Sequence, residues 1–332
     1  MPTVHWKISP EDPVRRNAAG GREYTMREEQ TEDAFQRQLA SKVQYCERTI
    51  REFLPAEVGY AGEVVRAMNY SVLAGGKRLR PLILHETAVM YGAGEDLVRP
   101  FMAAIEMIHT YSLVHDDLPA MDNDEYRRGQ KTTWAVYGEA MAILAGDGLL
   151  NYAYETAMRA FDAVQDEEER CRAAKALIIL ARNAGIHGMV GGQCADIQTD
   201  RDPDSVDEEM LHYIHRKKTA CMIESAFQCG AVLAGAPKED IGLLGQIALD
   251  VGLAFQIQDD ILDVVGSKDE LGKSTGKDEQ EGKLTYVSVF GLEESKARVK
   301  ELTEHARESF DDLSESSEFL EALVMHLMTR RK

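Results

Sequence analysis

Acidic residues gather in the stretch HDDLPAMDNDEYRRG (115–129), which places five carboxylates in eleven positions and then two arginines. Because neighbouring carboxylates repel one another, this clustering points to a bound cation. Asp116 and Asp122 are six residues apart, about 240° on a straight helix, so a straight helix cannot bring them together. Pro119 cannot continue a helix, and a bend after Leu118 would return Asp122 towards Asp116.

A second acidic group lies far downstream in FQIQDDILDVVG (255–266). Asp259 and Asp263 are four residues apart, about 40° on a helix, so they share one face, with Asp260 beside them. The alternative is a solvated acidic face. The apolar residues around the group argue against it, because buried carboxylates need cationic partners.

Two such groups facing each other would form an all-oxygen site. Oxygen ligands suit Mg²⁺ or Mn²⁺, and Mg²⁺ commonly completes its shell with water and substrate phosphate. Basic residues stand beside the acidic groups and near expected helix ends, and Arg and Lys both bind phosphate oxygens. These residues are Lys77, Arg80, Arg127, Arg128, Lys217, Lys218, Lys273 and Lys283. Together they predict a diphosphate held by metal.

The composition narrows the classes of protein and partner. The chain has 332 residues and a formal charge of −19, which disfavours nucleic acid and anionic membranes as partners. An anionic ligand would therefore need local cations. Five cysteines without a CxxC pair argue against disulfides and zinc, and we expect most of them to be buried and reduced. No uninterrupted apolar run approaches the roughly 18 residues of a membrane helix, and no secretory signal is visible. A cytoplasmic location is the default.

Apolar residues recur mainly at three- and four-residue spacing, which predicts helices. The clearest segments are 64–74, 139–161, 173–185, 217–235 and 243–266. Strand-like alternation is nearly absent. We therefore expect a single all-α domain of about ten helices over residues 26–332, preceded by a disordered extension or a start codon placed too early (1–25).

The ordered motifs resemble the trans-isoprenyl diphosphate synthases, most closely the bacterial type that makes a fifteen-carbon product. DDLPAMD looks like the first aspartate-rich motif of that family in its form with two inserted residues, and DDILD looks like the second. Further matches between residues 75 and 283 are GGKRLRP, EMIHTYSLVHDD, DEYRRG, GGQCADI, HRKKT, FQIQDD and GKSTGKDEQEGK. The resemblance implies a helical bundle around a central cavity and a homodimer.

The resemblance also implies roles for individual residues. Asp116 and Asp122 would hold two Mg²⁺ ions and Asp259 a third. The catalytic set would be Asp116, Asp117, Asp122, Arg127, Lys218, Asp259, Asp260 and Lys273, with Asp263 in support. The allylic diphosphate would be bound by Arg127, Lys218, Thr219, Gln256 and Lys273. Isopentenyl diphosphate would be bound by Lys77, Arg80, His109 and Arg128, and the basic end TRRK (329–332) resembles a tail that closes over it.

The implied reaction joins isopentenyl diphosphate to dimethylallyl or geranyl diphosphate by ionisation, condensation and elimination. Tyr111 and Ser112 lie about one turn before Asp116, where the growing hydrocarbon would run. An aromatic residue there resembles the floor of a farnesyl diphosphate site. The alternative is that Tyr111 is a plain core residue. His115 is expected to pack rather than to bind metal.

Rival interpretations come from several classes. GSKDELGKS (266–274) is one residue longer than a Walker A loop and follows a helix rather than a strand, which argues against an NTPase. A terpene synthase would not need Lys77, Arg80 and Arg128 together. A catalytically silent regulatory subunit would usually lose one aspartate motif, and this chain keeps both. A twenty-carbon (geranylgeranyl diphosphate) synthase remains the nearest alternative.

Overall fold

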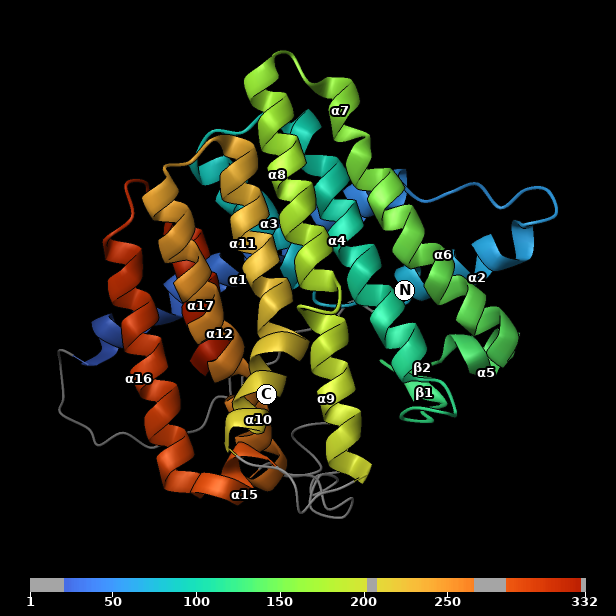
Figure 1. Cartoon of the computed structure of the whole chain (residues 1–332). Helices are drawn as coiled ribbons and strands as arrows, with labels where there is room; N and C mark the ends of the chain where they lie inside the picture. The colour runs from blue at the N-terminus through green and yellow to red at the C-terminus, as the bar shows by residue number, and fades with distance from the viewer. Residues whose placement is uncertain (1–20, 202–207, 266–284, 330–332) are drawn as a thin grey trace.

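The computed structural model describes residues 21–201, 208–265 and 285–329, most of which are helical (Figure 1). In chain order the helices are α1 (Gly21–Glu52), α2 (Gly62–Leu73), α3 (Leu79–Met90), α4 (Glu95–Asp116), α5 (Thr133–Tyr137), α6 (Glu139–Met158), α7 (Ala160–Ala163), α8 (Glu167–Ala184), α9 (Met189–Arg201), α10 (Glu208–Ile214), the π-helix η2 (His215–Ala220), α11 (Cys221–Ala234), α12 (Lys238–Val265), α15 (Tyr286–Phe290), α16 (Leu292–Asp311) and α17 (Glu318–Thr329). Strands β1 (Tyr126–Arg127) and β2 (Gln130–Lys131) form a short antiparallel hairpin. The all-α prediction is confirmed.

Helix α4 lies at the centre of the bundle because it is apolar around most of its circumference. Phe101, Met102 and Ile105 have no solvent exposure (0%). The helix packs against α6 and α3 and also touches α1, α2 and α11. The first aspartate cluster therefore begins at the last residue of a central helix, Asp116.

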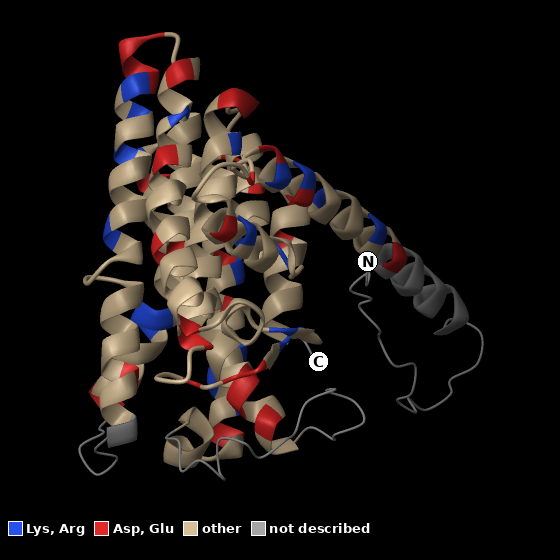
Figure 2. Cartoon of the chain, turned by 90° about the vertical axis from the view of Figure 1, so that its right-hand side faces the viewer, with Lys and Arg blue, Asp and Glu red and all other residues tan. Residues whose placement is uncertain are grey.

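Helix α12 forms a second long element of the core. It packs against α11, α16 and η2. Among the described helices it is also the one that is long and apolar enough to cross a membrane, but 56% of the relevant window is buried inside the bundle, as in a core helix. Figure 1 shows that α4 and α12 both end at the lower end of the bundle. In Figure 2, acidic and basic segments lie side by side towards that end.

The outer limits differ slightly from the expectation. Helix α1 begins at Gly21, five residues before the predicted start at Met26, and residues 1–20 lie outside the described part. All five cysteines are free. Cys46, Cys221 and Cys229 are buried, as predicted for most of the set, whereas Cys171 and Cys194 are exposed.

Candidate active site

The chain bends sharply after α4, where Pro119 was predicted to end the helix. The backbone N–H of Asp122 donates a hydrogen bond to the carbonyl oxygen of Asp116 at 2.8 Å. The Leu118 carbonyl accepts from Met121 (2.9 Å) and from Asn123 (3.1 Å), and Asn123 takes a left-handed backbone with φ +54°. The bend therefore brings Asp122 back beside Asp116, as the sequence predicted.

The carboxyl group of Asp116 is mostly desolvated, and it is influenced by the acidic Asp122 and the basic Lys218. Burial raises the pKa of its carboxyl to about 6, Lys218 lowers it, and the negative charge of Asp122 raises it further. Lys218 is about a hundred residues away in the chain, so its effect on Asp116 places η2 opposite the end of α4. A carboxylate in this position gains stability from a divalent cation.

Asp117 binds Arg127. The residue is 4% exposed, and its Oδ1 accepts from Arg127 Nε at 2.7 Å and lies 2.6 Å from Arg127 Nη2. Arg127 Nη2 also lies 3.8 Å from Asp124 Oδ2. Asp117 therefore fixes the orientation of the Arg127 guanidinium. Arg127 and Arg128 both belong to the hairpin formed by β1 and β2.

The hairpin that carries Arg127 was not predicted from the sequence. Its two turn residues, Arg128 (φ +54°) and Gly129 (φ +75°), both take left-handed backbone, as a two-residue type I′ turn requires. Tyr126 pairs with Lys131, and Arg127 pairs with Gln130. Gly129 was the available signal, but the flanking strands are too short for alternation to reveal them.

Three of the four residues predicted to bind isopentenyl diphosphate lie close together, namely Arg80, Arg128 and His109. Arg128 donates to the carbonyl oxygen of Gly75, in the same loop as Lys77. Burial lowers the pKa of Arg80, and its Nε is buried without a hydrogen-bond partner. Burial, followed by the charges of Arg80 and Arg128, keeps the pKa of His109 well below its ordinary value. His109 is thus neutral beside cations, and Lys77 lies in the loop that leads to Arg80.

Arg78 and Glu106 belong to this region and were missed. Arg78 Nη1 donates to Glu106 Oε1 at 2.7 Å, and both residues are almost completely buried. The sequence did carry a signal: Glu106 is the single carboxylate in the apolar run MAAIEMIHTYSLVH (102–115). A lone acid in a core helix requires a cationic partner.

Lys218 and Thr219 lie in the π-helix η2. Lys218 Nζ donates to Asp196 Oδ2 on α9, a residue within GGQCADI that had been given no role. The wide turn is held closely on two sides. A Cβ added to Gly192 would lie 2.2 Å from the Lys218 backbone nitrogen, and one added to Gly252 would lie 2.3 Å from the Ala220 Cβ. Such π-turns are frequent at functional sites.

The second aspartate cluster occupies the last turns of α12, which packs against η2 and α15. Asp259 is exposed, whereas Asp260 and Asp263 are half-buried. Asp260 Oδ2 accepts from the backbone N–H of Tyr286 at 2.7 Å, at the first residue of α15. Gln256 lies one turn earlier on the same helix. Lys273, Lys283 and residues 330–332 lie outside the described residues.

The donor set fits Mg²⁺. Asp116, Asp122 and Asp259 offer carboxylate oxygens alone, which are the ligands of a hard cation. Within residues 21–201, 208–265 and 285–329, no three His, Cys, Asp or Glu side chains form a ready-made cage. Mg²⁺ commonly binds one or two carboxylates and completes its octahedron with water and substrate phosphate.

Tyr111 lies one turn above the cluster, and it is 6% exposed. Its hydroxyl is buried without a hydrogen-bond partner, and burial, Tyr154 and Asp116 together raise the pKa of that hydroxyl. Ser112 Oγ donates to the carbonyl oxygen of His109 at 2.9 Å. His115 packs as predicted, since a Cβ added to Gly146 on α6 would lie 2.1 Å from its Nε2.

Known proteins are similar to the chain in sequence and fold. The family model for polyprenyl synthetase matches residues 62–323. The chain is 40% identical to a farnesyl diphosphate synthase of Escherichia coli over 302 residues, which is 90% of this chain and 99% of that protein. It is 41% identical to the large subunit 2 of a heterodimeric geranylgeranyl pyrophosphate synthase from Arabidopsis thaliana over 300 residues, covering 90% of this chain and 78% of that one.

Solved structures with a similar fold indicate the same family. A crystal structure of a geranyltransferase from Legionella pneumophila superposes with a TM-score of 0.78 at 28% identity, covering 90% of this chain and 99% of the other. The family model, which matches residues 62–323, spans both aspartate clusters and the basic group around Arg80. The chain therefore belongs to the polyprenyl synthetase family, and it is a trans-prenyltransferase.

Proposed function

We propose that the enzyme condenses isopentenyl diphosphate with dimethylallyl or geranyl diphosphate and releases farnesyl diphosphate. One observation supports this proposal most strongly: the Nε of Arg80 is buried without a partner, next to neutral His109 and to Arg128. A buried guanidinium N–H without an acceptor is costly unless an anion binds it. A second diphosphate site beside the aspartate clusters is what chain elongation needs and what a terpene synthase lacks.

The allylic diphosphate is assigned to the other side of the site. Arg127, Lys218, Thr219, Gln256 and Lys273 would hold its oxygens. Members of the family use a divalent metal ion, and we propose three Mg²⁺ ions on Asp116, Asp122 and Asp259. When bound, the metal supplies positive charge that stabilises the leaving diphosphate oxygens.

The side chains contribute fixed charge at the atoms where charge develops. Asp117 holds the Arg127 guanidinium in one orientation, so the cation needs little rearrangement when the allylic carbon–oxygen bond breaks. Lys218 exchanges Asp196 for the diphosphate oxygens. His109, which is neutral, offers a ring N–H to isopentenyl diphosphate without adding charge. The new carbon–carbon bond forms, and the proton lost from the condensed product leaves with the inorganic diphosphate.

Tyr111 is assigned as the floor of the hydrocarbon channel. Its ring is buried in the core between α4, Tyr154 of α6 and Cys221 of α11. A rigid aromatic ring at this depth supports a fifteen-carbon product. A geranylgeranyl diphosphate synthase is the second candidate, because relatives with that name are similar over most of the chain.

We assign the active form to a homodimer in the cytoplasm, without stable membrane insertion and without nucleic acid. The outer face of α6 supports self-association, since Ile143, Leu144 and Met158 expose apolar side chains there. One relative is a subunit of a heterodimer, so a silent subunit is the competing assembly. Light scattering of the pure protein, combined with an activity assay, distinguishes the two assemblies: an active dimer of this chain supports the homodimer, whereas an inactive chain supports the silent subunit.

The decisive experiment incubates the pure protein with Mg²⁺, isopentenyl diphosphate and geranyl diphosphate, and resolves the products by chain length. Farnesyl diphosphate as the main product supports the proposal. A twenty-carbon product keeps the reaction and overturns the length assignment. The absence of any condensation by the pure protein contradicts the proposal and favours the silent subunit.

A further inference from the structure

Arg78 has an unusual backbone for its type. It is the residue that precedes the first turn of α3, and its φ of +50° and ψ of +33° are left-handed. A residue other than glycine is uncommon in that region and is held there by its surroundings. Arg78 lies directly between Lys77 and the turn that carries Arg80. Whatever fixes Arg78 therefore fixes both of the proposed isopentenyl diphosphate ligands.

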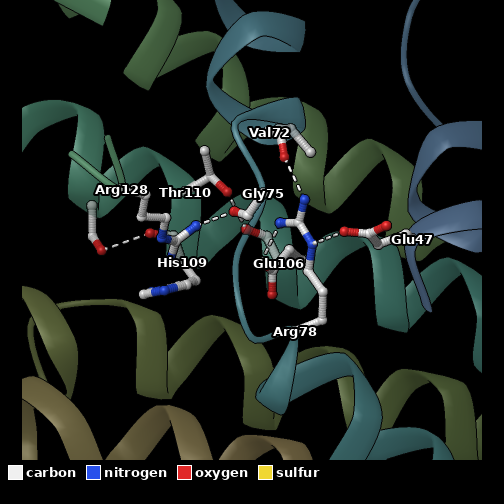
Figure 3. A network of polar contacts seen from close by, with 9 residues as sticks. Glu47, Val72, Gly75, Arg78, Glu106, His109, Thr110 and Arg128 are labelled. Atoms are coloured by element: carbon white, nitrogen blue, oxygen red, sulfur yellow. Dashed lines mark hydrogen bonds and ion pairs between the residues drawn. The ribbon is translucent and has the colours of Figure 1, made fainter. Parts of the chain in front are cut away.

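Three helices hold the Arg78 side chain, which is 3% exposed (Figure 3). Nη1 donates to Glu106 Oε1 of α4 at 2.7 Å, and Nη2 donates to the carbonyl oxygen of Val72 in the last turn of α2 at 2.7 Å. Nε lies 3.9 Å from Glu47 Oε1 of α1, an ion pair longer than a hydrogen bond. The Arg78 guanidinium thus links α1, α2 and α4 to the loop before α3.

Glu106 is the matching buried acid, with 3% of its side chain exposed. Its negative charge also acts beyond Arg78. Burial lowers the pKa values of Arg80 and Arg128, and Glu106 is the first charge that opposes this effect on both. One carboxylate therefore pairs with Arg78 and also offsets part of the cost of burying the charges of Arg80 and Arg128. Arg80 and Arg128 stay available to an anion.

Arg128 depends on the same loop. Its Nη1 donates to the Gly75 carbonyl oxygen (Figure 3). Its guanidinium also lies so close to Gly76 that a Cβ added to that residue would be 2.5 Å from Nη1. A shift of the loop would therefore move Arg128 as well as Lys77. His109 lies one turn after Glu106 on α4, on the side of these cations.

We propose that the buried Arg78–Glu106 ion pair is the positioning element of the isopentenyl diphosphate site: it locks residues 74–80, the loop and the first turn of α3, onto α4 and α2, so that Lys77, Arg80 and Arg128 meet one diphosphate. The inference rests on the proposed function. The side chains of Arg78 and Glu106 are each 3% exposed, so we assign both as positioning residues rather than as substrate contacts. The allylic residues Lys218 and Gln256 lie on η2 and α12, and Arg127 is held by Asp117 rather than by this pair.

The test is a comparison of Glu106→Gln with the unaltered enzyme in steady-state kinetics, with isopentenyl and geranyl diphosphate varied separately. Glutamine keeps the shape but leaves Arg78 buried without its counter-charge, which loosens the loop. We expect the KM for isopentenyl diphosphate to rise by about tenfold or more, with the KM for geranyl diphosphate within about twofold. Calorimetric titration with isopentenyl diphosphate alone should show the same loss of affinity.

A second variant keeps the test valid if Glu106→Gln does not fold. Arg78→Lys retains the charge opposite Glu106 but loses the forked geometry that reaches Val72, so we expect a smaller, selective rise in the same KM. Asp240→Asn is the matched control, because Asp240 is a 4%-exposed acid that binds Tyr91 and Ser314 in the first turn of α12, at the opposite end of that helix from the second aspartate cluster. It should lower the melting temperature without separating the two KM values.

An equal rise in both KM values for Glu106→Gln and Arg78→Lys would reduce the pair to general stability and overturn the inference. An unchanged or lower KM for isopentenyl diphosphate would overturn it as well. Failure of the proposed function is seen separately and earlier, because the unaltered enzyme would then not consume isopentenyl diphosphate at all.

Discussion

Asp122 is tied to Asp116 through the backbone, by a hydrogen bond of 2.8 Å from the Asp122 N–H to the Asp116 carbonyl oxygen. The bond closes the bend that follows Leu118 and Pro119. Two carboxylates that a straight helix would separate are thereby held at one point. Their mutual repulsion raises the pKa of Asp116 beyond the effect of its burial. This stored repulsion is relieved when a divalent cation binds between them.

Asp116→Asn should therefore weaken metal use rather than the fold. We expect kcat to fall on the order of 100-fold or more, since charge stabilisation at the leaving group is lost, and the Mg²⁺ concentration for half-maximal activity to rise. The measurement is a Mg²⁺ titration of the initial rate. Asp147→Asn, which removes an exposed acid on α6, should leave that titration unchanged. A normal Mg²⁺ dependence in Asp116→Asn would contradict the ligand assignment.

Tyr111→Ala should lengthen the product, because removing the ring opens space beneath the fifteen-carbon chain. Tyr111→Phe is the matched control, since it keeps the ring. It should retain the product and leave stability equal or up to about 1 kcal/mol higher, because the Tyr111 hydroxyl is buried without a partner. Mass spectrometry of the hydrolysed products reads both variants. An unchanged farnesyl profile from Tyr111→Ala would refute the floor assignment.

Gly192→Ala should displace the π-helix that carries Lys218. The added Cβ would lie 2.2 Å from the Lys218 backbone nitrogen, and overpacking of this kind costs about 1–3 kcal/mol. We expect lower stability in denaturant unfolding together with a rise in the KM for the allylic substrate. Gly242→Ala on α12 is the control. Nothing lies within 4 Å of its added Cβ, so it should be neutral or stabilising by about 0.5–1 kcal/mol. Equal behaviour of the two variants would show that the close approach is unimportant.

His215 gives a pH dependence of stability. Burial lowers its pKa to about 4, and His212 lowers it further whereas Asp196 opposes the shift. The unfolded chain, with a pKa near 6.5, then binds more protons than the folded chain between those two values. The stability contribution is complete above about pH 6.5 and declines by up to about 3 kcal/mol as the pH falls towards 4.

His215→Phe should flatten this decline, since phenylalanine keeps the contact with the Tyr286 ring (6.4 Å between centroids) and cannot be protonated. Denaturant unfolding at pH 7, 6 and 5 measures the effect. His187→Gln removes an exposed histidine and should leave the pH profile as it is. If the free energy of unfolding of His215→Phe falls with pH as steeply as that of the unaltered protein, the account of His215 is wrong.

The sequence predicted the features that depend on local spacing. Helical periodicity gave the all-α class, and Pro119 between Asp116 and Asp122 predicted the bend that the structure has. The features it missed depend on contacts between distant segments. Arg78 looked like one more basic residue beside Lys77, because nothing local reveals that Glu106, 28 residues later, lies against it. Asp196 gained a role only when α9 packed beside η2 and met Lys218.

The π-helix and the hairpin were missed for a related reason. A wide turn at His215–Ala220 leaves the apolar pattern almost unchanged, and its stability comes from the close approach of Gly192 and Gly252 on other helices. The hairpin spans two residues on each strand, too few for alternation to appear. These elements carry Lys218 and Arg127, so the cationic half of the site depends on tertiary packing more than the acidic half does.

The most direct test of the central claim measures inorganic diphosphate released by the pure enzyme from geranyl diphosphate, with and without isopentenyl diphosphate. Chain elongation predicts one diphosphate for each isopentenyl diphosphate consumed, only when both substrates and Mg²⁺ are present, and none after chelation of the metal. Release from geranyl diphosphate alone, at a rate that isopentenyl diphosphate does not change, would contradict the account and indicate a terpene synthase.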